Sequence, residues 1–182
     1  MRILATAVVA SLALSLGACS DDDPRPADPT SAATTSPTVS PPPSQPTSSM
    51  ADSRQGVTDF VSYYLRVLSH AHLTGDTDEL GRLSDASCSA CQSYISAIDE
   101  LAEDGGTITG GTRTFDGAEV RYSGPGGESL LTINVKIGSG TRQATPASEK
   151  TRVAASRMRL TFGVKGSGTD RRISRIFQGD PT

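Results

Sequence analysis

The protein has 182 residues, a formal net charge of −3 and no tryptophan. All eight aromatic residues lie between Phe60 and Phe177, which excludes an aromatic core before residue 51. The length and the absence of an internal repeat therefore predict one folded domain, over residues 51–182, that is long enough to bury a single hydrophobic core.

The start of the chain has the pattern of an export signal. Arg2 precedes a run of apolar and small residues over positions 3–16. This run is too short for a transmembrane helix, which needs ~20 residues. Small residues directly before Cys19 resemble a bacterial lipoprotein signal, so we expect residues 1–18 to be a signal peptide and Cys19 to be the lipidated first residue of the mature chain. An ordinary secretory signal is the alternative.

Residues 19–50 have the composition of a disordered tether. They contain no aromatic residue and eight of the eleven prolines. Such a segment cannot bury enough apolar surface to offset the entropy of ordering, and its prolines favour an extended chain with a reach of up to ~90 Å. The sequence thus predicts a protein bound to the membrane through a diacylglyceryl group on Cys19, on the outer, extracytoplasmic face of the cytoplasmic membrane.

The first part of the predicted domain is helical. Apolar residues recur at three- and four-residue spacing between Val57 and His72, which predicts a helix with one buried face. Gly75 is expected to end this helix as its left-handed C-cap. Asp76, followed three residues later by Glu79, has the pattern of a capping box and predicts a short second helix.

A third helix is predicted from about Ser87, with Cys88 and Cys91 on its apolar stripe. Their α-carbons would be ~5 Å apart, which a disulfide tolerates, and disulfides persist in exported proteins. A redox couple is one alternative, but an attacking thiolate needs solvent access. Zinc is the other, but only His70 and His72 could complete the site, at a spacing that matches no zinc module we recognise. We therefore expect a structural disulfide and no metal site.

The hydrophobic period changes from 3.6 to 2 in the second half of the domain. Alternation over residues 131–137 and again over 158–164 predicts two strands, each with one buried face. Residues 118–123 and 171–178 are further strand candidates beside glycine-rich turns. Helices followed by strands predict an α+β fold in which three N-terminal helices pack on a curved antiparallel β-sheet.

Two resemblances follow from these patterns. The element order and the stretch AHLTGDTDELGRLS, residues 71–84, resemble the cone-shaped fold of nuclear-transport-factor-two-like domains. The signal, the tether and the run TGDTDELGRLSDASCSAC, residues 74–91, are similar to an actinobacterial lipoprotein family of unknown function. These resemblances imply a cone-like fold and a membrane-anchored location, and they transfer no catalytic residue.

The charges divide along the chain. Residues 51–104 carry ten acidic and three basic residues, whereas residues 105–182 carry six and twelve. The predicted candidate binding surface consists of Arg157, Arg159, Lys165, Arg171 and Arg172. It would bind an anionic envelope polymer or an acidic protein partner, and a solvated or ion-paired face is the alternative. Nucleic acid is not an expected partner outside the membrane.

A pocket at the open end of the cone is the second candidate site. Its expected lining residues are Tyr64, His72, Tyr94 and Asp99. His72 lies on an apolar helix face, where a buried core histidine is the simpler interpretation. No residue pattern indicates catalysis or a cofactor. The favoured function is a non-enzymatic binding or scaffolding module, and small-molecule binding or catalysis in the pocket is the alternative.

Overall fold

The structure is a computed structural model that describes residues 41–179. Within these residues the chain forms an α+β domain with three α-helices and two antiparallel sheets, which confirms the predicted class. The predicted signal peptide, Cys19 and most of the predicted tether lie outside the described residues. None of the helices in this part of the chain is long and apolar enough to cross a membrane.

The helices come first along the described chain. They are the 3₁₀ helix η1 (Thr47–Met50), α1 (Arg54–Thr74), α2 (Asp78–Leu83) and α3 (Ser89–Glu103). The strands are β1 (Thr107–Gly110), β2 (Arg113–Arg121), β3 (Ser129–Ile137), β4 (Gly140–Gln143), β5 (Thr151–Val153), β6 (Ser156–Lys165) and β7 (Arg172–Gln178). A short 3₁₀ helix, η2 (Gly168–Asp170), precedes β7.

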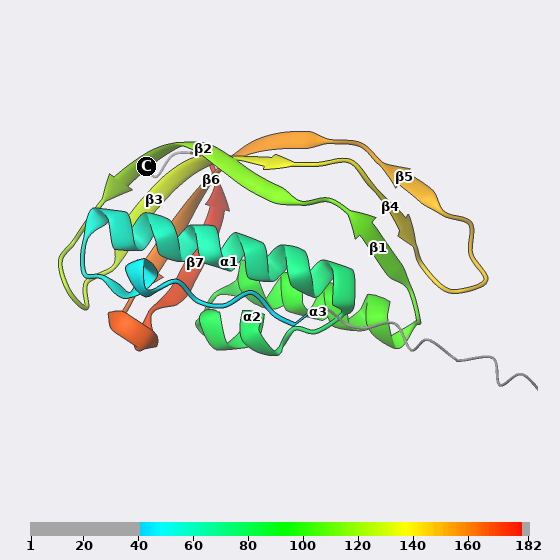
Figure 1. Ribbon diagram of the computed structural model, residues 1–182, viewed down its shortest axis with the longest axis horizontal. Coiled ribbons are helices and arrows are strands. Elements are labelled where there is room, and N and C mark those ends of the chain that lie inside the picture. The colour runs from blue at the N-terminus through cyan, green and yellow to red at the C-terminus, as the bar shows by residue number, and fades with distance from the viewer. Residues whose placement is uncertain (1–40, 180–182) are drawn as a thin grey trace, which may run out of the picture. The chain divides into compact units, whose positions relative to one another are not determined.

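The strands form two sheets, where the sequence predicted one. The larger sheet has the order β2-β3-β6-β7 and the smaller has the order β1-β4-β5. Only two residues separate each strand of the smaller sheet from a strand of the larger one. Figure 1 shows β1, β4 and β5 grouped at one end of the strands. Gly110, the last residue of β1, and Gly111, which follows it, have positive φ angles of 74° and 71°, and two such residues in succession end the extended strand. The cone-like shape stays a prediction.

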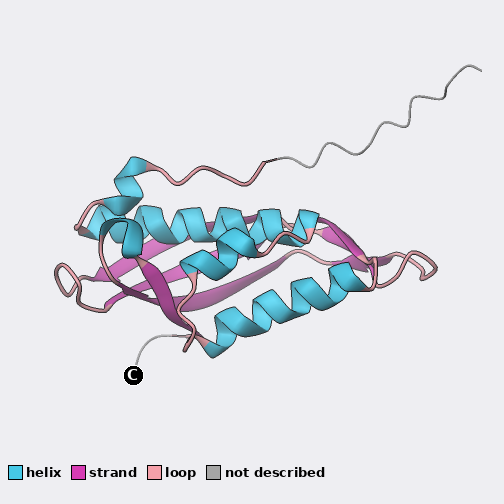
Figure 2. Cartoon of the chain, turned by 90° about the horizontal axis from the view of Figure 1, so that it is seen from below, coloured by secondary structure: helices cyan, strands magenta, loops and turns pink. Residues whose placement is uncertain are grey.

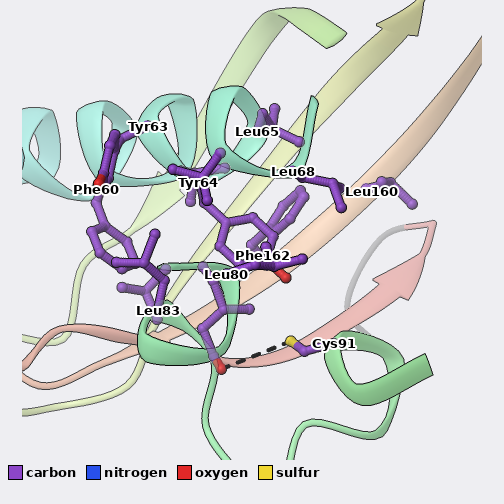
Figure 3. Close-up of a cluster of buried hydrophobic side chains, with 14 of the residues drawn as sticks. Phe60, Tyr63, Tyr64, Leu65, Leu68, Leu80, Leu83, Cys91, Leu160 and Phe162 are labelled. Atoms are coloured by element: carbon purple, nitrogen blue, oxygen red, sulfur yellow. Dashed lines mark hydrogen bonds between the residues drawn. The ribbon is translucent and has the colours of Figure 1, made fainter. Parts of the chain in front are cut away.

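All three helices lie on one side of the larger sheet (Figures 1 and 2). We call this side the inner face and the opposite side the outer face. On the inner face, Leu131 of β3 is paired with Phe162 of β6, and both are buried. Tyr64 of α1 packs edge-on against Phe162, with ring centroids 6.3 Å apart. Figure 3 shows these aromatic rings within the cluster of side chains that joins the helices to the sheet.

A bulge in β2 keeps its apolar residues on the inner face. The register with β3 shifts between Asp116 and Glu119, around Gly117 with its φ of 64°. Because of this extra residue, Phe115 and Val120 both pack against the core, although strict alternation would put them on opposite faces. Asp116 and Glu119 lie on the outer face.

The helix ends follow the predicted signals only in part. Gly75 caps α1 with a φ of 77°, as predicted. The predicted capping box is wrong, because α2 begins at Asp78 and its N-cap is Thr77, with no side-chain capping bond. Asp76 instead accepts a hydrogen bond from the Asp78 amide 3.1 Å away, and the Thr77 hydroxyl donates to Asp99 of α3 at 2.7 Å. The two acids of the predicted capping box, Asp76 and Glu79, therefore do not cap α2. Asp76 stabilises a local turn, and Glu79 contacts other side chains.

Candidate functional site

A cavity of about 130 Å³ lies between the helices and the inner face. Leu65 and Leu68 of α1 and Tyr94 of α3 form the helical side, and residues from β2, β3, β6 and β7 form the other. The lining is apolar or aromatic except for one residue, Arg113 of β2. A mostly apolar cavity with a single polar group has the composition of a small-molecule site.

A second cavity, of about 280 Å³, is continuous in its lining with the first. The two share Arg113 and Ile137, which are register partners on β2 and β3. The second cavity lies where the two sheets meet and is also lined by His72 and Arg142. Neither lining contains an aspartate or a glutamate. The two cavities thus form one electropositive region on the inner side of the domain.

The side chain of Arg113 is half-buried and, within residues 41–179, has no acidic partner. It lies two residues from Phe115 on the inner-facing side of β2. One guanidinium nitrogen lies 3.3 Å from His72 Nε2, and the other donates to the Gly111 carbonyl at 3.5 Å. Among residues 41–179 no carboxylate lies within 4.0 Å of this guanidinium. Burial lowers the pKa of Arg113 from its ordinary value, but arginine keeps its charge at neutral pH.

His72 is held neutral between Arg113 and the backbone of α1. Arginine can only donate hydrogen bonds, so His72 Nε2 must be the acceptor. His72 Nδ1 then carries the hydrogen and donates it to the Leu68 carbonyl at 2.8 Å. Burial, and secondarily the charge of Arg113, lowers the pKa of His72 from its ordinary value. The ring therefore orients the guanidinium and has no free nitrogen for proton transfer.

The structure separates the four predicted pocket residues. Tyr94 lines the smaller cavity and His72 the larger one. Tyr64 is fully buried, with its hydroxyl 3.5 Å from Ser84 Oγ, and burial raises its pKa to about 12. Asp99 accepts the hydrogen bond from Thr77 and lines neither cavity. Tyr64 and Asp99 therefore line neither of these two cavities.

The sequence interpretation missed Arg113, the residue that distinguishes the site. Its strand was not predicted, because the segment before residue 118 is polar and contains a glycine at the bulge. The available signal was the alternation of Arg113 with Phe115, which puts both on one face of a strand. That alternation identifies the face but not the cavity, because Leu65 and Tyr94 come from distant parts of the chain.

The arginines of the predicted binding surface are paired on the outer face. Asp116 of β2 lies 2.5 Å from Lys136 and 4.0 Å from Arg157, and Glu119 lies 3.3 Å from Arg159. The opposing acids come from β2, two strands away from β6. The outer face therefore carries both signs of charge, in the pattern of an ion-paired surface.

Arg171 does not belong to the predicted surface, because its side chain is only 2% exposed. Its guanidinium donates to the carbonyls of Ser49 and Ala51 and to Asp52 Oδ1, the last at 2.9 Å. Ser49 is itself buried, so the folded domain begins before the predicted boundary at residue 51. Because the guanidinium of Arg171 donates to acceptors inside the domain, it is not available to bind an external ligand.

The other two basic residues of the predicted surface have different environments. Arg172 is half-buried and donates to the carbonyls of Thr169 and Arg171. Lys165, at the end of β6, is exposed. The five predicted residues therefore do not form one continuous basic surface.

The structure contains a disulfide between Cys88 and Cys91, with α-carbons 5.2 Å apart. Both residues are buried. Cys88 is the N-cap of α3, and its Sγ accepts a hydrogen bond from the Cys91 amide, so the helix begins at Ser89, slightly later than predicted. Within the described residues no group of three or more histidine, cysteine or acidic side chains could hold a metal ion.

Comparisons with known proteins identify a fold and a family. The intermembrane-space region of the chloroplast protein ARC6 is similar in structure, with a TM-score of 0.52 and 13% identity over 72% of this chain and 99% of that one. This similarity concerns the fold alone. No curated protein matches the sequence. The model of DUF6318, a family of unknown function, matches residues 25–165, and the chain therefore belongs to this family.

Proposed function

We propose that the protein is a non-enzymatic binding module for a small molecule, anchored by a lipid at Cys19 on the outer face of the cytoplasmic membrane. The observation that carries the binding role is the apolar cavity whose lining contains one guanidinium, that of Arg113, and no acidic residue. A cavity with few convergent polar groups fits orientation of a ligand better than it fits a packed core.

The chemistry of the cavities favours binding over catalysis. Their linings hold no carboxylate and no cysteine. Both nitrogens of His72, the one base in either lining, are engaged in hydrogen bonds. The linings do contain hydroxyl groups, those of Tyr94, Thr109 and Ser156, but no carboxylate or free imidazole in the linings could activate them as nucleophiles.

Export is supported by the pattern of residues 1–19 and by the disulfide of Cys88 and Cys91, because disulfides persist outside the reducing cytoplasm. The prolines before residue 47 would hold the domain away from the membrane surface. We further propose an actinobacterial origin and a nuclear-transport-factor-two-like fold, in which the helices cover the inner side of the strands.

A docking role for the outer face has less support. Its arginines, Arg157 and Arg159, already lie near the carboxylates of β2. A binding partner would have to compete with these internal pairs.

Membrane fractionation tests the anchor. Cys19→Ser is expected to release the protein from membranes, because the lipid would have no attachment atom. Membrane retention of this variant would contradict lipid anchoring.

A methyl NMR titration with hexan-1-ol, an uncharged apolar probe, tests the cavity. The protein used is the chain from residue 19 onwards, with Cys19 replaced by serine. We expect the methyl signals of Met158 and Leu160 to shift on titration, because both line the smaller cavity. Val135→Phe should abolish the shifts by filling that cavity, whereas Leu73→Phe, at an exposed position, should leave them. If hexan-1-ol shifts no methyl signal of the cavity in the chain without a cavity substitution, the binding role is overturned.

A further inference from the structure

We infer that the ligand of this cavity is a small amphipathic carboxylate, whose apolar part lies in the smaller cavity and whose carboxylate binds the guanidinium of Arg113. This inference rests on the proposed function, because it gives the chemical class of ligand for the same site. It is carried by the position of Arg113, by the charges around it and by the size of the cavity.

Arg113 lies at the junction of the two cavities. It lines both the smaller, apolar one and the larger one beside it. Its guanidinium has five N–H donors in a planar fork, and the structure assigns one contact to His72 and a long one, at 3.5 Å, to Gly111. The remaining N–H groups can donate to both oxygens of a carboxylate in bidentate geometry.

The local charge selects an anion. Arg113 and Arg142 are the charged side chains in the two linings, which contain no acidic residue. The acids of β2 itself, Asp116 and Glu119, lie on the outer face and pair with Lys136 and Arg159. A partly desolvated cation without a counter-ion is unfavourable, and an anionic ligand would remove that penalty. A ligand ammonium would instead be repelled.

The size of the smaller cavity limits the apolar part of the ligand. An apolar cavity of roughly 150 Å³ holds a benzene molecule. At about 130 Å³, the cavity fits a short acyl chain or a single ring. A longer ligand would have to extend past Arg113 into the second cavity. The expected class is therefore a monocarboxylic acid with a small apolar group.

A purely structural role for Arg113 makes a different prediction. β2 is an edge strand of the larger sheet, and an inward-pointing charge on an edge strand can deter pairing with another chain. In that role the guanidinium would confer no preference between charged and neutral ligands of the same size.

The test compares hexanoate, hexan-1-ol and hexylamine on the mature Cys19→Ser chain, by methyl NMR titration at neutral pH and low salt. Hydrogen bonds to a charged group are strong enough that we expect hexanoate to bind about tenfold or more tightly than hexan-1-ol. Hexylamine should bind no more tightly than hexan-1-ol, because Arg113 repels its ammonium group.

Variants on one strand locate the effect. Arg113→Gln should remove the preference for hexanoate, and Arg113→Lys should keep part of it, because lysine retains the charge but not the fork. Arg121→Gln is the matched control, since Arg121 is exposed on the outer-facing side of the same strand. Its preference for hexanoate should equal that of the parent chain.

The outcomes separate the ligand class from the binding role. Equal affinity for hexanoate and hexan-1-ol in the parent chain overturns the carboxylate assignment, while binding of both still supports a ligand cavity. Binding of none of the three probes overturns both. A preference that survives Arg113→Gln but is lost in Arg142→Gln overturns the assignment to Arg113. The comparison within the parent chain holds even if Arg113→Gln does not fold.

Discussion

Arginine side chains have different charged neighbours on the two faces of the larger sheet. On the outer face, Arg157 and Arg159 of β6 lie near Asp116 and Glu119 of β2, in pairs open to water. On the inner face, Arg113 lies in an apolar lining with no acid within ion-pair distance among residues 41–179. Exposed pairs contribute only ~0–1 kcal/mol each, because water already solvates both charges.

This difference identifies the inner face as the functional candidate. The outer arginines Arg157 and Arg159 lie near carboxylates of the same domain, so an external partner would have to compete with these pairs. The guanidinium of Arg113 on the inner face is half-buried and has donors that are not used by the described residues, so it could bind an anionic partner. Arg171 is a third case, because it is buried but fully engaged with the N-terminal segment. The number of arginines therefore says less about function than whether each one is paired.

The largest expected effect comes from two phenylalanines on adjacent strands. Phe162 of β6 is buried on the inner face, whereas Phe177 of β7 is half-buried opposite Thr161 on the outer face. Phe162→Ala should lower the free energy of unfolding by ~3–5 kcal/mol through the cavity it leaves. Phe177→Ala should cost about 1 kcal/mol. Denaturant unfolding measures both, and equal losses would break the distinction between the faces.

Arg171 and Arg175 provide a matched pair of cations. Arg171→Met should cost ~3 kcal/mol, because it leaves the Ser49 and Ala51 carbonyls without their donor. Arg175→Met should cost ~0–1 kcal/mol, because its pair with Glu128 is exposed. The same unfolding measurement tests both, and limited proteolysis should cut Arg171→Met faster before residue 53. A loss below 1 kcal/mol for Arg171→Met would contradict its anchoring role.

The disulfide should have an intermediate effect. Replacing Cys88 and Cys91 together by alanine should lower stability by ~2 kcal/mol, because the closed loop is very short. Thiol labelling of the folded protein without reductant should modify neither residue. Ready labelling of both would reopen the redox and metal interpretations.

The smallest effect is a pH dependence from His72. Burial and Arg113 lower its pKa in the folded state, so below pH ~6.5 the unfolded chain takes up a proton that the native ring resists. Stability should thus be unaffected by this group above pH ~6.5 and fall as the pH decreases, by at most about 1.4 kcal/mol per pH unit because the two states differ by no more than one proton on this ring.

NMR titration of the His72 ring measures that pKa directly. Arg113→Gln should raise it towards the ordinary value by removing the neighbouring positive charge, and Arg121→Gln should leave it unchanged. A His72 pKa above 6.5 in the parent chain would contradict the arrangement of the two side chains.

Regular periodicity made much of the fold predictable. The three-and-four spacing located α1, and alternation located β3 and β6 with the inner faces they have in the structure. Alternation did not predict which residues of β7 face the core. The register between β6 and β7 shifts at Gly163 and Val164 of β6, so Ile173 and Ile176 of β7 both pack towards the core. A bulge depends on the partner strand, and a single strand carries little sign of it.

By itself the sequence determined the α+β class, the main helices and strands and the cysteine spacing that allows a disulfide, because each depends on neighbouring residues and on local backbone geometry. Only the tertiary structure decided which arginines are paired. The partners of Arg159 and Arg171 come from Glu119 and Ser49, which are distant in sequence, and Arg113 has no such partner in the described residues. Charge neutralisation depends on distances in space, and those are set only when the sheet and its covering segments assemble.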